Sequence, residues 1–398
     1  MSDGVTEAAP GEAATPRPGL AFAGIFAVTF AGLLGVGAVL PVLPRYIHGT
    51  LHEGNLAVGV VVGCYAITGL LLRPVSGRLA DTRGRRPMVL FGAIVLGLSG
   101  LLYLPSLGIA GLIVARLLLG VGEGTVYTAG SAWIVDLSPP ARRGRVLGLY
   151  GLAVWGGLSV GPLAGEAIYH AAGFHAVWLF AAAMPLLGAA IASRVPDPFR
   201  PLPHAEPHPL IAPEAVLPGT AVALASFGYA AVATFIVLHL EARGVGHGAT
   251  VFAAFAAMIV LARLAAGDLP DRVGGAPVAI GATLGEAVGL LLIAFADSLP
   301  VALLGGMAMG AAFSLLNPAL MLIAVSQVSQ SARGAVMGTF TAFFDAGVGI
   351  GAPLAGLAAA LSDYEGSFLL AAAVAAGSAL LILSTLHRPG PRRTKAAS

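Results

Sequence analysis

The sequence predicts an all-α membrane protein with twelve membrane-spanning helices, arranged as two six-helix parallel repeats. Of its 398 residues 57% are hydrophobic and only 10% are charged, whereas a soluble domain carries about 25% charged residues. Apolar stretches of the roughly 20 residues needed to cross the hydrocarbon core recur along the chain. They are Leu20–Leu43, Leu56–Gly77, Pro87–Leu104, Ile109–Val135, Val146–Tyr169, Phe174–Ser193, Val216–Leu240, Ala249–Gly267, Ala276–Ala296, Leu299–Val325, Ala335–Ala360 and Ser367–Leu386.

An internal repeat divides these spans into two sets of six. A constant shift of 190 residues pairs Arg73 with Arg263, Gly77 with Gly267, Asp81 with Asp271, Gly84 with Gly274, Gly120 with Gly310, Arg143 with Arg333, Gly157 with Gly347 and Gly161 with Gly351. An even number of spans per half gives both copies the same orientation, as in parallel repeats related by an axis along the membrane normal. We expect one bundle at residues 19–193 and the other at residues 216–387.

The remaining segments are polar. Residues 1–18 are rich in Pro and Ala and are expected to form a disordered cytoplasmic tail without the basic region and cleavage site of a signal peptide. The segment Arg194–Pro213 holds seven Pro, so residues 194–215 are predicted to link the two bundles. Residues 388–398 form a basic tail.

The basic residues predict the orientation of the chain. Most of them fall in loops on one side, namely Arg78, Arg83, Arg85, Arg86, Arg142, Arg143, Arg145, Arg194, Arg200, Arg272 and Arg333, together with both tails. The opposite loops hold only Arg45 and Arg243. Because positive charge marks the cytoplasmic side, we expect a multi-pass inner-membrane protein with both termini in the cytoplasm.

The composition also excludes several partners and activities. A net charge of only +2 argues against nucleic acid, and the single Cys64 excludes an internal disulfide or a cysteine metal cluster. No metal-ligand spacing and no ATP-binding Gly-Lys loop occurs, and His residues fall in loops or near span ends. We expect no metal, no cofactor and no catalytic residues, and a monomer in the lipid bilayer that is not an enzyme.

The loop after the second span carries the most specific motif, Gly77-Arg78-Leu79-Ala80-Asp81-Thr82-Arg83-Gly84-Arg85-Arg86. It resembles the signature loop of the major facilitator superfamily, and a degenerate copy runs from Gly267 to Gly274. The resemblance implies a cytoplasmic latch that holds the two halves together in the outward-open state. The latch residues would be Gly77, Asp81, Arg83, Gly84, Arg85, Arg86 and Asp271. The alternative is a solvated basic turn that only fixes topology.

Two further motifs resemble parts of this superfamily. The fifth span holds Gly157, Gly161, Pro162 and Gly165, similar to the antiporter motif of the family's proton-coupled drug exporters. Gly at every fourth position forms a smooth stripe on one helix face, so a plain packing stripe is the alternative. The fourth span begins its motif at Arg116, which matches a family residue implicated in proton transfer.

Ionisable residues near the bilayer centre are costly and are therefore functional candidates. Counting from the span ends places Glu123, Glu286 and Asp345 near mid-depth and Arg116 farther out. We expect proton coupling through Glu123 with Arg116, or through Asp345, although a structural ion pair is the alternative. For Glu286 we expect a buried structural bond, and for Arg73 a structural grip on Asp81 or Asp136.

The cavity between the halves is expected to be apolar and aromatic. Its candidate cargo contacts are Tyr65, Tyr127, Trp155, Phe227, Tyr229 and Asn317, each of which could instead pack in the core. Such a cavity suits an amphipathic small molecule. The resemblance therefore implies secondary transport, with small amphipathic or drug-like molecules exported in exchange for protons by alternating access. An importer or facilitator of sugars or small organic acids with the same fold is the main alternative, and a membrane-embedded enzyme is a remote one.

Overall fold

The computed structural model describes residues 18–138, 143–195, 197, 212–326, 328 and 333–386, and the elements of these ranges are helices. In the first half they are α1 (Pro18–Val39), α2 (Val42–Arg45), the π-helix η1 (Tyr46–Thr50), α3 (Asn55–Gly63), α4 (Tyr65–Arg83), α5 (Arg85–Leu101), α6 (Gly108–Asp136) and α7 (Arg143–Ala192). In the second half they are α8 (Pro213–Ala242), α9 (Gly248–Ala266), α10 (Leu269–Val273), α11 (Gly275–Ala294), α12 (Leu299–Val325) and α13 (Arg333–Leu386). The predicted tails and most of the predicted linker lie outside the described residues.

The described helices account for all twelve predicted crossings. Nine helical runs are long and apolar enough to cross a membrane. Two of them, in α7 and α13, turn back on themselves, at Gly173 with φ 74° and at Asp363 with φ 66°, and so cross twice. The 17-residue helix α5 supplies the remaining crossing. The predicted fold class is therefore confirmed.

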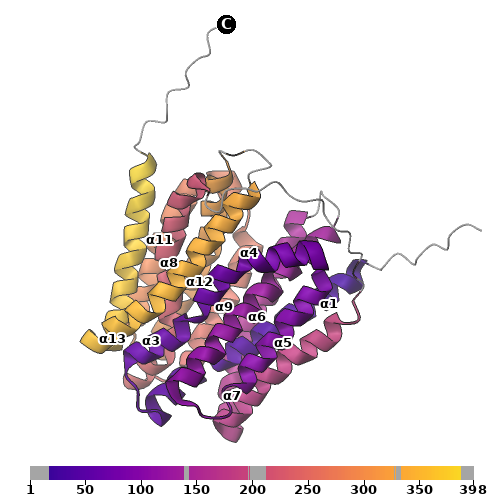
Figure 1. Ribbon diagram of the computed structural model, residues 1–398. Helices are drawn as coiled ribbons and strands as arrows, with labels where there is room; N and C mark the ends of the chain where they lie inside the picture. The colour runs from indigo at the N-terminus through magenta and orange to yellow at the C-terminus, as the bar shows by residue number, and fades with distance from the viewer. Residues whose placement is uncertain are drawn as a thin grey trace, which may run out of the picture.

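The halves pack as two bundles that touch along one side. Within the first half α1 packs against α7 and α5 against α6, and within the second half α8 packs against α13 and α11 against α12. Contacts between the halves come mainly from α3 with α13 and from α7 with α9. In Figure 1 the indigo-to-pink helices and the salmon-to-yellow helices form these two groups.

The repeat found in the sequence has the same local geometry in both halves. Gly84 and Gly274 turn the chain with φ 106° and 102°, a conformation that favours glycine because it has no Cβ. A Cβ on Gly120 would lie 2.0 Å from the carbonyl oxygen of Tyr65. A Cβ on Gly310 would lie 2.3 Å from the carbonyl oxygen of Phe255. Gly310 and Phe255 follow Gly120 and Tyr65 by the same 190 residues.

The boundary after the second span differs from the sequence prediction. The stretch from Gly77 to Arg86 was expected to be a loop, but α4 continues through Arg83 and only Gly84 interrupts the helix. The reason is that residues 78–83 include no helix breaker, so the helix extends past the apolar part of the span. We call the end of the molecule that holds Gly84 and Gly274 the signature-loop end, and the opposite end the Arg45 end.

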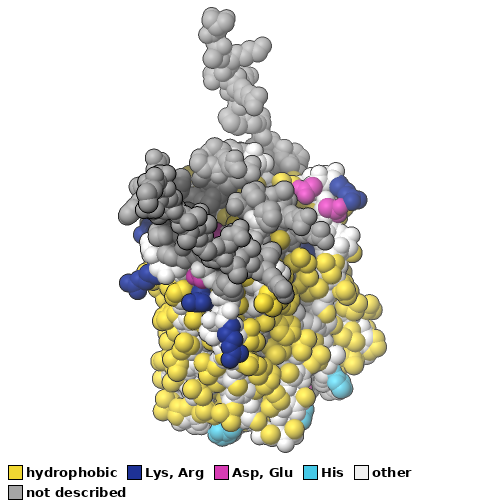
Figure 2. All heavy atoms as spheres, turned by 90° about the vertical axis from the view of Figure 1, so that its right-hand side faces the viewer, with side chains coloured by type: hydrophobic (Ala, Val, Ile, Leu, Met, Phe, Trp, Pro, Cys, Tyr) yellow, Lys and Arg dark blue, Asp and Glu magenta, His cyan; other side chains and the backbone are white. Residues whose placement is uncertain are grey.

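The surface has the pattern of a membrane protein. Large apolar side chains are well exposed along several helices, for example Leu71, Leu264 and Leu361. Figure 2 shows a broad apolar band on one face, with Arg side chains toward its upper, signature-loop end and His side chains at the lower end. Such a band would be costly in water and suits the hydrocarbon core of a bilayer.

The glycine stripe of α7 packs inside its own bundle. A Cβ on Gly161 would lie 2.7 Å from both the Cα of Gly37 and the carbonyl oxygen of Leu34, so α1 and α7 meet backbone to backbone. Gly157 and Gly165 face α1 just as closely. A Cβ on the equivalent Gly347 of α13 would lie 2.3 Å from the carbonyl oxygen of Ala223 of α8. The stripes therefore hold each bundle together.

We predict that Gly161→Leu destabilises the folded protein, because the added side chain has no room against α1. Overpacking of this kind costs about 1–3 kcal/mol. Thermal unfolding of the detergent-purified protein measures the effect, with Gly148→Leu on the same helix as control, since a Cβ at Gly148 meets nothing within 4 Å. Equal melting temperatures for the two variants would contradict the packing described here.

Candidate functional site

A central cavity of about 90 Å³ lies between the two halves. Its charged lining residues are Arg116 and Glu123, its aromatic ones are Tyr65, Trp155, Tyr229 and Phe344, and the rest are Leu, Val and Ala. Small-molecule sites usually measure roughly 300–1,000 Å³. The cavity must therefore widen before it can hold a drug-sized cargo.

Arg116 of α6 is held against the backbone of α3. Its Nε donates to the carbonyl oxygen of Val61 at 3.3 Å and its Nη2 to that of Val62 at 2.6 Å. The guanidinium carbon also lies 4.8 Å from the centre of the Tyr65 ring, a cation–π distance. No carboxylate of the described chain lies within ion-pair distance of it. The positive charge of Arg116 is thus stabilised by carbonyl dipoles and an aromatic face.

Glu123 is a half-buried carboxyl at the cavity wall, two helical turns from Arg116 on α6. None of the described side chains donates a hydrogen bond to it or forms an ion pair with it. The next residue, Gly124, faces α4, because a Cβ there would lie 3.7 Å from Cγ of Arg73. Glu123 itself lines the cavity, and the guanidinium of Arg73 is close enough for its charge to act on the carboxyl.

The second acidic candidate, Asp345, joins the two bundles. Its carboxylate accepts hydrogen bonds from Nε of Arg73 at 2.6 Å and from Nη2 at 3.0 Å, and only 5% of Asp345 is exposed. Arg73 also lies 5.4 Å from the centre of the Tyr127 ring. The expectation that Arg73 grips Asp81 or Asp136 is wrong, since its planar fork reaches across to α13.

An aromatic cluster extends from the cavity lining into the second half. Trp155 of α7 packs edge-on against Tyr229, Phe255 and Phe313, with ring centres 5.8–6.2 Å apart. The last three residues belong to the second half, so this contact also crosses between the bundles. Edge-to-face pairs at these distances are favourable. The cavity therefore has a charged wall and an aromatic wall.

Three of the predicted cargo contacts line this cavity and three do not. Tyr65, Trp155 and Tyr229 are in the lining. Tyr127 lies one turn beyond Glu123 and is 37% exposed, while Phe227 packs against Gly351 of α13. Asn317 is half-buried, one turn beyond Phe313 toward the signature-loop end. Helical periodicity alone does not show at which turn of a cavity-facing stripe the cavity ends.

An ion-pair cluster that the sequence analysis missed closes the Arg45 end. The guanidinium of Arg45 binds both carboxylate oxygens of Glu166 at 2.6 and 2.9 Å, and its Nε donates to Glu241 of the second half at 2.6 Å. His170 lies 3.1 Å from Glu166. Close by, Asn55 of α3 donates to the carbonyl oxygen of Ala359 of α13 at 3.1 Å. We call Arg45, Glu166 and Glu241 the end clamp.

The end clamp left a weak signal in the sequence. Arg45, Glu166 and Glu241 stand at the same ends of the first, fifth and seventh spans. Considered by itself, Arg45 is only one of the two basic residues in the loops on its side of the membrane. Matching the depths of charges on different spans would have brought the three together.

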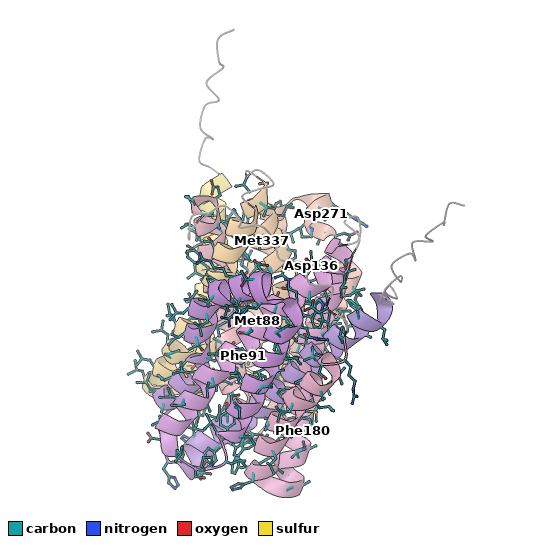
Figure 3. All side chains as sticks on the ribbon, turned by 45° about the vertical axis from the view of Figure 1, so that its right-hand side comes forward. Met88, Phe91, Asp136, Phe180, Asp271 and Met337 are labelled. Atoms are coloured by element: carbon teal, nitrogen blue, oxygen red, sulfur yellow. The ribbon has the colours of Figure 1, made fainter. Side chains whose placement is uncertain are left out.

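The predicted latch residues lie at the signature-loop end. Arg85 pairs with Asp81 one turn away and with Asp136 of α6 at 2.9 Å. The backbone N–H of Arg86 donates to Asp197, and Arg83 and Asp271 are exposed. Figure 3 shows Asp136 and Asp271 at the same end of the molecule. Among the described residues, no hydrogen bond or ion pair joins Asp81 or Arg85 to the second half.

Comparison with known proteins agrees with this architecture. The profile of the Major Facilitator Superfamily matches residues 25–275 and, a second time, residues 218–398. The chain belongs to the major facilitator superfamily. It is 33% identical over 392 residues to the protein named uncharacterized MFS-type transporter YhhS of Escherichia coli K12, a match that covers 96% of both chains. It is therefore a membrane-embedded transporter and not an enzyme.

Solved structures share the fold at low sequence identity. The nucleoside transporter NupG superimposes with a TM-score of 0.74 at 13% identity, covering 93% of this chain and all of that one. The human organic anion transporter MFSD10 (TETRAN) superimposes with a TM-score of 0.71 at 19% identity, covering 92% and 100%. These likenesses establish the fold alone.

We predict that Arg45→Gln separates the two halves at the Arg45 end, because it removes the positive charge that Glu166 and Glu241 share. Spin labels at Glu53→Cys and Ala242→Cys, both exposed at this end, in a Cys64→Ser background, report the distance by double electron–electron resonance. We expect a longer and broader distance distribution than in the protein that retains Arg45. His170→Gln is the control, since the contacts of His170 with Glu166 and Tyr169 both stay within its own half. Unchanged distances would show that the apolar contacts of α3 with α13 suffice to close this end.

Proposed function

We propose that this transporter exports small amphipathic molecules by alternating access and that it exchanges them for protons. The observation that carries the proposal is the position of Glu123, an unpaired carboxyl that lines the cavity beside an ion pair joining the two halves. A carboxyl inside a membrane is expensive unless it is paired or has a role in transport. No cofactor or metal is needed for such a cycle.

The chemistry that we propose is competition for Arg73. When Glu123 loses its proton, its negative charge attracts the guanidinium that is bonded to Asp345, and the bond between the bundles weakens. Proton binding to Glu123 removes this attraction and strengthens the cross-bundle pair. Arg116 lies on the same helix and adds a fixed positive charge to the cavity wall. Protonation would thus change how firmly the two bundles are held together.

The proposed orientation places the Arg45 end outside. The basic residues gather near the signature-loop end, which by the positive-inside rule faces the cytoplasm, with both termini there, in the inner membrane. With the end clamp formed and Asp81 paired within its own half, the chain has the arrangement expected of an inward-facing state. The latch of Asp81, Arg83, Arg85, Arg86 and Asp271 would engage the second half only in the outward-open state.

The cavity walls favour an amphipathic cargo over a sugar. Apart from Arg116, Glu123 and two tyrosines, the lining is apolar, whereas a sugar site needs several hydrogen-bonding side chains. Import of sugars or small organic acids remains the alternative. Purified protein in vesicles separates the two, by uptake of a panel of lipophilic cations, lipophilic acids and sugars with and without an imposed proton gradient. Accumulation of a sugar without any response to the gradient would overturn the proposal.

We predict that Asp81→Asn lowers transport while folded protein still accumulates, because the amide keeps the shape of the side chain and loses its charge. The exposed pairs of the present state contribute only about 0.2–1 kcal/mol, so the variant should melt close to the parent. Initial transport rates in vesicles, normalised to the amount of folded protein, measure the effect. Thr82→Ala, a neighbour whose hydroxyl donates only to its own helix, is the control. Transport at the parental rate would mean that the loop only fixes topology.

We predict that Glu123→Gln keeps cargo binding largely intact and abolishes the response of transport to the proton gradient. Glutamine preserves volume and hydrogen bonding but cannot bind and release a proton. Gradient-driven transport in vesicles and cargo binding in detergent measure the two properties. Asp345→Asn is the comparison, since breaking a buried ion pair costs about 3–5 kcal/mol and should lower stability as well. Full gradient-driven export by Glu123→Gln would falsify the proposal, and a loss confined to Asp345→Asn would move the coupling role to α13.

A further inference from the structure

Glu286 of α11 is a buried carboxyl that has no partner in the part of the chain that the structure describes. The residue is 0% exposed, and neither carboxylate oxygen has a hydrogen-bond partner among the described residues. The structural bond expected for it from the sequence is therefore absent. Such a group is unusual, because buried polar side chains almost always find a partner.

The side chains beside the carboxyl where it meets α8 are apolar. A Cβ on Gly228 of α8 would lie 2.4 Å from Oε1 of Glu286, and the same position is flanked by Leu290 and by Met309 of α12. Gly228 therefore leaves the space that the carboxyl fills. The carboxyl lies between α8, α11 and α12, in the interior of the second bundle.

The titratable groups of the neighbouring helices have other positions or partners. On α8, Tyr229 lines the cavity, His239 bonds to the carbonyl oxygen of Ile293, Glu241 belongs to the end clamp and Glu214 is exposed. On α13, Asp345 is bonded to Arg73, and Asp363, Tyr364 and Glu365 lie at the turn of the helix at the Arg45 end. Neither α12 nor the rest of α11 has a titratable residue. Within the described chain, no cation compensates a charge on Glu286.

The physical consequence is that the carboxyl holds a proton. An ionised carboxylate in apolar surroundings, with neither a cation nor a donor, is far less stable than the neutral acid. We propose that Glu286 is a second proton-binding site of this transporter, located in the second half and separate from Glu123. Its proton is released when α8 moves away from α11. Binding forms one O–H bond on a carboxylate oxygen, and release returns the proton to the cavity.

Gly228 provides the connection between Glu286 and the cavity. It is the residue before Tyr229, which lines the cavity, so one side of α8 meets the carboxyl and a neighbouring side of the same turn borders the cavity. Position 228 itself adds no side chain between the two. In the present state α8 covers the carboxyl completely. A shift of α8 during the change between states would expose Glu286 to the cavity water.

Infrared spectroscopy of the purified protein tests proton binding without measuring transport, so its outcome is independent of the proposed function. In a Glu123→Gln background at neutral pH, where exposed carboxyls are ionised, we expect a carbonyl band of a neutral carboxylic acid. Glu286→Gln in that background should remove the band, and Asp345→Asn should leave it in place. The assignment is overturned if the band persists after Glu286→Gln. It is also overturned if the protein that carries only Glu123→Gln shows no such band.

Exchange of this proton for deuterium tests its release. The neutral-acid band shifts when deuterium replaces the proton after transfer of the protein to D₂O. We expect the rate of this shift to be low in the parent and at least several-fold higher in Arg45→Gln, because that substitution loosens the end clamp. Gly228→Ala should alter the position of the band, since its Cβ would touch the carboxyl. Gly281→Ala on α11, whose Cβ meets nothing within 4 Å, should not. Equal exchange rates in the parent and in Arg45→Gln would show a static buried acid and overturn release.

Discussion

Arg73 and Asp345 come from different halves of the chain, and each would be costly alone in an interior with little water. Together they form two hydrogen bonds that hold α4 against α13 beside the cavity. Removing one partner of such a pair leaves an uncompensated charge and costs about 3–5 kcal/mol. The same guanidinium lies over the Tyr127 ring, and the bond adds to the contacts of α3 with α13 and of α7 with α9 that join the two bundles.

The repeat shows how the cavity acquired two unlike walls. Under the shift of 190 residues, Asp345 is the counterpart of Trp155, Glu123 of Phe313 and Tyr65 of Phe255. In the first two pairs an acidic side chain of one half corresponds to an aromatic ring of the other, and in the third a tyrosine corresponds to a phenylalanine. At both places a side chain crosses between the bundles, through an ion pair from Asp345 and through ring packing from Trp155. The backbone is nearly symmetric, while the chemistry of the interface is not.

Much of this fold could be predicted from the sequence because the bilayer leaves few choices. Span length, the repeat and the fold class all follow from apolar runs and glycine positions, and α12 has the predicted bounds. The site was harder to predict, because which side chains pair across the bundles depends on their depth in the membrane and on the rotation of each helix. The sequence placed Glu123, Tyr65, Trp155 and Tyr229 near the cavity. It gave Arg73 the wrong partner, expected a bond for Glu286 and missed the end clamp, since each of these depends on which helices face each other.

The glycine stripes have a mechanical consequence. Because α1 and α7, and likewise α8 and α13, meet with almost no space for even one added methyl group, each of these two helix pairs resists deformation and would move as one unit in the proposed cycle. A helix such as α12, with 27 residues, is about 40 Å long, so a tilt of about 15° around its middle would move each end by about 5 Å. In the proposed cycle, a small rearrangement where Arg73 meets Asp345 would thereby be magnified at both membrane surfaces. Stiff helix pairs would allow the making and breaking of one central bond to decide which surface of the membrane the cavity faces.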